Sequence, residues 1–176
     1  MEDFEKFYNK ALEFLSYRTR SEKEVRDRLQ LKIQKSHLRQ GFRLRKRFGG
    51  QVGGQAKIKI DESIIDRIIE KLKEKKFIND EEFAKMFLEN RLRFKPRSLR
   101  LIKLELKQKG IAPETINNLE LTIDNDLESA KKLVEKRIER LKGLPKQKIY
   151  EKLGRYLASK GFNWDTIKKS IDPVKS

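Results

Sequence analysis

A phrase of eight residues occurs twice in this chain and constrains the fold more than any other feature. Residues 109–116 (KGIAPETI) recur as residues 160–167 (KGFNWDTI), at a spacing of 51 residues. The Gly in each copy suits the left-handed position that ends a helix, because it has no Cβ to clash there. Pro113 suits the first turn of the next helix, and Asn163 suits a helix cap. A recurring helix–turn–helix phrase indicates a repeat architecture.

An apolar stripe followed by an arginine precedes each copy of the phrase and also occurs near the start of the chain. The three arginines are Arg18, Arg91 and Arg137. The stripes match position for position: Ala11, Phe14 and Leu15; Ala84, Phe87 and Leu88; Ala130, Leu133 and Val134. Residues 60–65 replace the turn phrase in a degraded third copy. These matches predict three repeats, at residues 1–78, 79–124 and 125–176.

Each repeat contains three stretches with apolar residues at helical spacing, so we expect nine helices. A three-helix repeat is too small to bury its apolar face alone, and neighbouring repeats should therefore stack. The sequence predicts an all-α fold of three tandem three-helix repeats in an elongated, curved array, with a basic β-hairpin-like insert in the first repeat.

Local signals place several helix starts and core positions. Ser21 and Asn79 each begin a capping-box pattern, in which the first side chain accepts a hydrogen bond from a backbone amide three residues later. Pro96 is expected to open the second helix of the second repeat. Trp164 is expected to face the core of the third repeat together with Ile167 and Ile171.

The insert, residues 34–60, separates the second and third helices of the first repeat. Apolar and basic residues largely alternate over 42–47 and again over 56–60, on either side of a glycine-rich stretch at 49–54. Alternation with a period of two around such a turn predicts a β-hairpin with one cationic face. The alternative is that the second helix continues through Arg47.

Positive charge is concentrated in two segments. The chain has 44 Lys and Arg residues against 27 Asp and Glu, a net charge of +17. Residues 31–60 carry nine cations and no acidic residue, and residues 91–100 carry five cations and no acidic residue. This distribution favours an anionic partner, and cations just before a helix start suit an anion site.

The sequence offers no catalytic or metal-binding constellation. It has no cysteine, and its one histidine, His37, cannot form a metal site alone. Most carboxylates stand at helix starts or opposite lysines at helical spacing, where capping and surface pairing explain them. No segment is apolar over the length of a membrane span. We therefore expect a cytoplasmic, monomeric, non-enzymatic protein without cofactor, metal or membrane association.

Four segments resemble signatures of the RecX family of regulatory proteins, in the family's order. They are residues 11–29, 77–84 (FINDEEFA), 105–111 (ELKQKGI) and 160–162 (KGF). The resemblance covers nearly the whole chain apart from the insert, which family members usually lack. It implies the helical array, and a bacterial cytoplasmic protein that binds the RecA recombinase filament on single-stranded DNA. Family members typically lodge in the filament groove, inhibit strand exchange and ATP hydrolysis, and also bind DNA.

The cations of the basic segments and of the first helical junction are the expected contacts with filament or DNA. They are Lys35, Arg39, Arg43, Arg45, Lys46, Arg47, Lys57, Lys59, Arg18, Arg20, Arg91, Arg93, Lys95, Arg97 and Arg100. The insert is expected to add phosphate contacts. The arginine shared by the repeats has a second interpretation, in which it braces each repeat internally. Expected partners are the RecA filament and single-stranded DNA, with duplex DNA left open.

Other functions are compatible with the charge. The first is a helical module that binds DNA or structured RNA without a recombinase partner, and charge alone would favour it. It predicts a base-reading helix, but residues 114–121 carry Asn117 and Asn118 and no base-reading cation. A ribosome or transfer-RNA binder should present aromatic stacking platforms, whereas most aromatic residues here fall on core positions. A helical scaffold would not need the charge of the insert.

Overall fold

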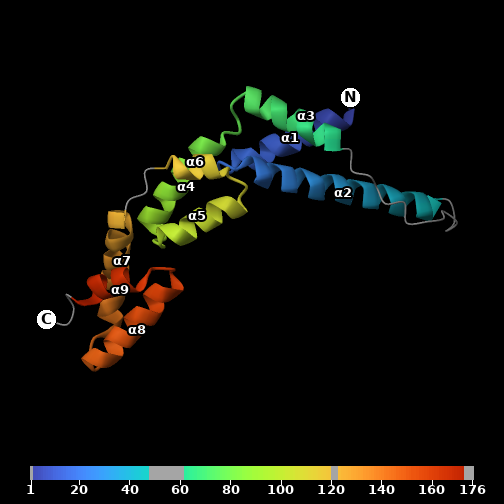
Figure 1. Cartoon of the computed structure of the whole chain (residues 1–176). Helices are drawn as coiled ribbons and strands as arrows, with labels where there is room; N and C mark the ends of the chain where they lie inside the picture. Colours follow the sequence, from blue (N-terminus) through green and yellow to red (C-terminus); the bar gives the residue numbers. More distant parts are fainter. Residues whose placement is uncertain (1, 48–61, 120–122, 173–176) are drawn as a thin grey trace. The chain divides into compact units, whose positions relative to one another are not determined.

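The computed structural model describes the backbone of residues 2–47, 62–119 and 123–172, and side chains at 3–36, 38, 63–119 and 126–172. The described residues form nine α-helices and one 3-10 turn, and no strand occurs among them (Figure 1). The all-α fold predicted from the sequence is confirmed. The chain divides into two compact units, residues 1–83 and 84–176.

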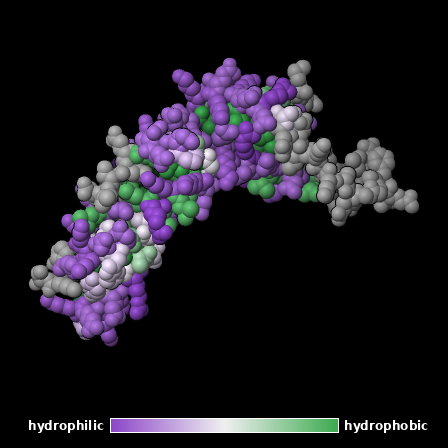
Figure 2. Space-filling view, in the orientation of Figure 1, coloured by the Kyte–Doolittle hydropathy of each residue, from purple (hydrophilic) through white to green (hydrophobic). Residues whose placement is uncertain are grey.

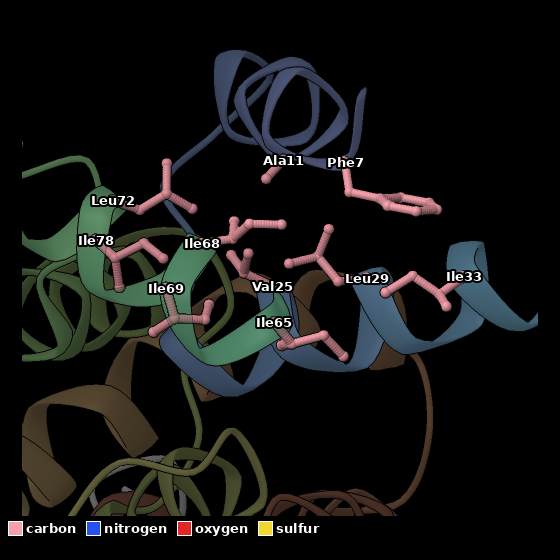
Figure 3. Packing of buried hydrophobic residues seen from close by; sticks show 10 residues of the cluster. All are labelled: Phe7, Ala11, Val25, Leu29, Ile33, Ile65, Ile68, Ile69, Leu72 and Ile78. Atoms are coloured by element: carbon pink, nitrogen blue, oxygen red, sulfur yellow. The ribbon is translucent and has the colours of Figure 1, made fainter. Parts of the chain in front are cut away.

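The first unit is a three-helix arrangement around one apolar core. It contains α1 (Glu2–Ser16), α2 (Glu22–Arg47) and α3 (Glu62–Glu74). Figure 3 shows side chains from all three helices meeting in the core. The buried residues are Phe7, Ala11, Val25, Leu29, Ile33, Ile65, Ile68, Ile69, Leu72 and Ile78. The spacing of three and four along α3 places its apolar side chains on one face, as the sequence predicted.

The β-hairpin prediction is wrong for the described part of the insert. α2 continues through Arg47, so residues 34–47 are helical, while residues 48–61 lie outside the described part of the chain. Leu, Lys, Arg and Gln favour helix, and extending a helix that is already nucleated costs little. An isolated hairpin is only marginally stable in water. The alternation over 42–47 was therefore outweighed by continuation of α2.

The second unit contains two further triplets. The second repeat has α4 (Asp80–Phe94), which begins at the end of the first unit, then α5 (Leu99–Gln108) and α6 (Pro113–Asn117). The third has α7 (Ile123–Ile138), the 3-10 turn η1 (Glu139–Leu141), α8 (Lys146–Ser159) and α9 (Trp164–Ile171). The third repeat has its own apolar cluster, formed by Ala130, Leu133, Val134, Leu141, Leu153, Leu157, Phe162, Ile167 and Ile171.

The duplicated phrase adopts the predicted turn in both copies. Gly110 and Gly161 have φ angles of 82° and 86°, which favour glycine. Gly161 also lies against α5, since a Cβ placed on it would be 2.6 Å from Ser98 Oγ. The Asn163 side chain accepts a 2.8 Å hydrogen bond from the Thr166 amide, as expected of a helix cap. Pro113 is the first residue of α6.

Two local predictions are corrected by the structure. α5 begins at Leu99 with Ser98 as its cap, and not at Pro96, because the Ser98 hydroxyl accepts the Leu101 amide. Trp164 does not face the core: its side chain is 62% exposed at the first position of α9. The core positions of that helix begin one turn later, at Ile167.

A carboxylate from the following repeat caps the second helix in two places. The Glu22 amide donates a 2.8 Å hydrogen bond to Asp80 Oδ1, and the Leu99 amide donates a 2.7 Å bond to Asp126 Oδ1. Asp80 and Asp126 occupy the same repeat position, four residues before the matched alanines of the stripe. Burial raises the pKa of both carboxyls, while the donated hydrogen bond acts in the opposite direction. Each contact joins consecutive repeats within one unit.

Removing either carboxyl should weaken the chain, whereas keeping an acceptor oxygen should not. We expect Asp80→Ala and Asp126→Ala each to lower the free energy of unfolding by about 1–2 kcal/mol, because a helix-start amide loses its acceptor. Asp80→Asn retains an oxygen in the same place and should lose much less. Urea denaturation at neutral pH measures the difference, and equal losses for Ala and Asn would contradict the capping role.

The same position should show a defined pH dependence. A raised pKa means that the ionised carboxylate is less favourable in the folded chain than in the unfolded chain. The part of the stability that depends on the protonation of Asp80 is therefore fully present below its unfolded pKa and is lost as the pH rises through its folded pKa, while the hydrogen bond from the Glu22 amide remains. We expect Asp80→Asn to gain stability relative to the parent chain as the pH rises from about 4, the ordinary pKa of an Asp, through the raised pKa of Asp80 in the folded chain. A difference that does not change with pH would contradict this sign.

Candidate nucleic-acid interface

The arginine shared by the repeats has an internal partner in the second repeat. Arg91 Nε lies 2.7 Å from Glu105 Oε2, so the pair joins α4 to α5. The guanidinium of Arg91 also lies 4.5 Å from the centre of the Phe87 ring. Arg97 pairs with the other oxygen of the Glu105 carboxylate. Two of the five cations predicted from residues 91–100 are thus bound to a single carboxylate.

The matching arginines make equivalent contacts in the other repeats. Arg18 lies 3.0 Å from Glu24 Oε1 and so connects the end of α1 to α2. The guanidinium of Arg137, on α7, stacks 4.1 Å from the centre of the Tyr156 ring on α8. Tyr156 and Glu105 occupy the same repeat position, four residues before the lysine of the turn phrase. The interpretation of the shared arginine as an internal brace is confirmed.

Three other cations of the segment face solvent instead. Arg93, Lys95 and Arg100, called the exposed trio below, are all exposed. No carboxylate in the described part of the chain forms an ion pair with any of them. Between them on the chain stands Phe94, whose side chain is 62% exposed. The guanidinium of Arg93 lies 5.2 Å from the centre of the Phe94 ring.

A second group of cations gathers over Phe14 in the first unit. The guanidinium carbons of Arg20 and Arg28 lie 4.1 Å and 5.3 Å from the centre of the ring. Burial, followed by the neighbouring charge of Arg18, lowers the pKa of Arg20. Arg18, Arg20 and Arg28 here face one carboxylate, that of Glu24, so an excess of positive charge remains that suits an anion such as a phosphate.

The insert contributes a basic half-helix. α2 has Glu22 and Glu24 in its first turn, and its continuation carries Lys35, Arg39, Arg43, Arg45, Lys46 and Arg47. This order suits the helix dipole, which favours acids at the start and cations at the end. Lys35 is exposed. Beyond Ser36, Leu38 is the only side chain of α2 that is described, and Lys57 and Lys59 lie outside the described residues.

The surface around these cations is strongly polar. Figure 2 shows hydrophilic residues over most of the face that it presents in each unit. Within the described residues, no three His, Cys, Asp or Glu side chains group closely enough to hold a metal ion. None of the helices there has the length and apolar character needed to cross a membrane.

Comparison with known proteins assigns the family. Models of the RecX three-helix domains match in order: the first at residues 8–33, the second at 79–118 and the third at 124–171. The regulatory protein RecX of Clostridium beijerinckii is 32% identical over 177 residues, covering 98% of this chain and 70% of that protein. The chain belongs to the RecX family.

Other RecX proteins agree with this assignment. That of Clostridioides difficile is 32% identical over 94% of this chain. The crystal structure of RecX from Lactobacillus salivarius aligns with a TM-score of 0.69 at 27% identity, covering 99% of this chain and 97% of that one. The chain spans 66% of the length of the C. difficile protein and 57% of that of Bacillus velezensis.

The family models also mark the insert. The model of the first RecX domain ends at residue 33, where the buried stripe of α2 ends among the described side chains. The continuation of α2 through Arg47 therefore lies beyond the part of the repeat that this RecX model matches.

The exposed aromatic residues were missed from the sequence. Tyr17, Phe77, Phe94 and Trp164 have side chains that are 77%, 49%, 62% and 62% exposed, although most aromatic residues were expected on core positions. Phe94 falls seven residues after Phe87, so its phase alone suggests burial. Its position inside a run of cations, at the last residue of α4, is the signal that could have identified it.

The internal pairing of Arg91 can be measured by a double-mutant cycle. We expect Arg91→Gln and Glu105→Gln each to lower the free energy of unfolding by about 1–2 kcal/mol, with a coupling of at least about 0.5 kcal/mol between them. Arg93→Gln is the matched control, since an exposed arginine should change stability by less than about 0.5 kcal/mol. Chemical denaturation provides the values. Equal losses for Arg93→Gln and Arg91→Gln would contradict the brace.

Proposed function

We propose that this chain regulates a RecA recombinase by binding its filament on single-stranded DNA and inhibiting ATP hydrolysis and strand exchange. The observation that carries the proposal is the ordered match to three RecX domains. Curated relatives bear the name of a regulatory protein. The action is that of a cytoplasmic, non-enzymatic protein, which works by binding, as a monomer and without a cofactor.

The charge of the chain supports a partner that carries phosphates. A filament on single-stranded DNA presents a polyanion, and each cation that neutralises a phosphate releases a counterion. The residues proposed for these contacts are the exposed trio, Arg20, and the cations of α2 from Lys35 to Arg47. Lys57 and Lys59 belong to the same proposal through their place in the basic insert.

Arg91 and Arg97 are proposed to stabilise the repeat rather than to contact phosphates. Both share the Glu105 carboxylate, so contact with a phosphate would require them to exchange one anion for another. Arg18 likewise has Glu24. We therefore assign these three arginines to holding the helices that present the exposed cations.

A nucleic-acid-binding module without a recombinase partner is the alternative. The exposed trio beside a solvent-facing aromatic ring favours it, because cations and a ring are sufficient to hold a nucleic acid strand. Under this alternative, the chain would affect a recombinase only by competing with it for DNA.

Inhibition of ATP hydrolysis separates the two functions. We expect the chain, added well below the concentration of the RecA recombinase of the same organism, to inhibit hydrolysis that depends on single-stranded DNA. Inhibition should persist when free single-stranded DNA is added in excess, because the target is the filament. If the excess DNA abolishes inhibition, the chain competes for DNA and the alternative replaces the proposal.

A further inference from the structure

The turn between α4 and α5 brings together two features that single-stranded nucleic acid requires. The first is positive charge that is not engaged within the protein. Glu105 holds Arg91 and Arg97, while the exposed trio faces solvent. The five cations of this segment therefore divide into two that stabilise the repeat and three that can meet phosphates.

The second feature is an aromatic ring that the fold does not use. Phe94 ends α4 with 62% of its side chain exposed, whereas Phe83, near the start of the same helix, is 3% exposed. Leaving a ring of this size in water forgoes the stabilisation that burial would give. Among the described residues, the ring is in contact with Arg93, whose guanidinium lies 5.2 Å from the centre of the ring.

The local backbone fixes where the ring stands. Lys95 donates its amide to the Arg91 carbonyl at 3.2 Å, so α4 keeps its geometry up to Phe94. The Ser98 amide donates to the Lys160 carbonyl at 3.1 Å, which anchors the other end of the turn on the third repeat. Arg93 and Phe94 thus end α4, Lys95 begins a four-residue connection that is held at both ends, and Arg100 lies in the first turn of α5.

From this arrangement we propose that Phe94 is a stacking platform for an unpaired nucleobase, with the exposed trio binding the adjoining phosphates. The platform deepens the proposed function, on which it rests, by giving the chain a preference for single-stranded over duplex nucleic acid. Only an unpaired base offers its face to a side chain, whereas cations alone bind either form. Arg93 beside the ring adds a guanidinium plane against which a base can also stack.

Binding of short oligonucleotides tests the platform. A fluorescent twelve-nucleotide oligothymidine and a hairpin duplex are titrated with the full chain at fixed salt. We expect Phe94→Ala and Phe94→Leu to weaken binding of the single strand by about 5- to 150-fold, since stacking of one base on an aromatic side chain strengthens binding by this factor. Duplex affinity should change less than about twofold. Phe94→Trp should restore single-strand binding, because it restores an aromatic face.

A matched control separates stacking from general loss of apolar surface. Leu104 lies on α5 in the same unit and is 49% exposed, so Leu104→Ala removes a comparable exposed apolar side chain. It should leave the affinity for both oligonucleotides unchanged. Circular dichroism of every variant verifies that the helices remain folded, which is expected because both side chains face solvent.

Each other outcome has a defined meaning. If Phe94→Leu binds the single strand as well as the parent chain, or loses duplex and single strand equally, the platform is refuted and the proposed function stands. If the parent chain has no affinity for oligothymidine yet inhibits the recombinase, the platform is again refuted. If the parent chain neither binds the oligonucleotide nor inhibits hydrolysis, both the platform and the proposed function fail.

Discussion

Backbone amides at a helix start have no partner within the helix, and this constraint organises the repeats. At the start of α5, the Leu99 amide donates to Asp126 and the Ser98 amide donates to the Lys160 carbonyl. Gly161, from the duplicated phrase, packs closely against Ser98. The start of α5 thus contacts the first helix of the third repeat, through Asp126, and the turn phrase of that repeat, through Lys160 and Gly161. At the start of α2, the Glu22 amide likewise donates a hydrogen bond to Asp80, from the second repeat.

A second constraint is the distribution of positive charge. The chain has many more cations than anions, yet the shared arginine of each repeat is held by a carboxylate or a ring between its first two helices. The cations that face solvent are those that this internal pairing does not engage. In residues 91–100 the remainder is the exposed trio around Phe94. The same basic segment therefore supplies the arginines that hold the repeat, through Glu105, and the exposed cations of the proposed interface.

Most of the fold could be predicted from the sequence because its signals are local or repeated. Gly110 and Gly161 required a backbone conformation that only a few residues adopt readily, and the apolar stripes repeated at matching positions. The caps at Asp80 and Asp126 could not be predicted, since both residues also fit an ordinary acidic first turn of their own helix. Their acceptor role depends on a contact between residues that are 58 and 27 positions apart.

The errors have physical reasons as well. Alternation over residues 42–47 suggested a strand, but a strand needs a partner and a core, whereas α2 needed only to continue from a nucleated turn. Phe94 and Trp164 have phases that fit a buried stripe, yet each stands at one end of its helix with 62% of its side chain exposed. Periodicity identifies the face of a helix and cannot say where the packed part of that face ends.

The central claim is that internal pairing decides which cations reach the nucleic acid. The most direct measurement is the slope of log affinity against log salt for single-stranded DNA, compared between Lys95→Gln and Arg97→Gln. The account predicts that Lys95→Gln reduces the slope by about 0.7, the value of one phosphate contact, and that Arg97→Gln leaves it unchanged. An equal reduction in both variants would show that pairing with Glu105 does not keep Arg97 from binding a phosphate, and would contradict the account.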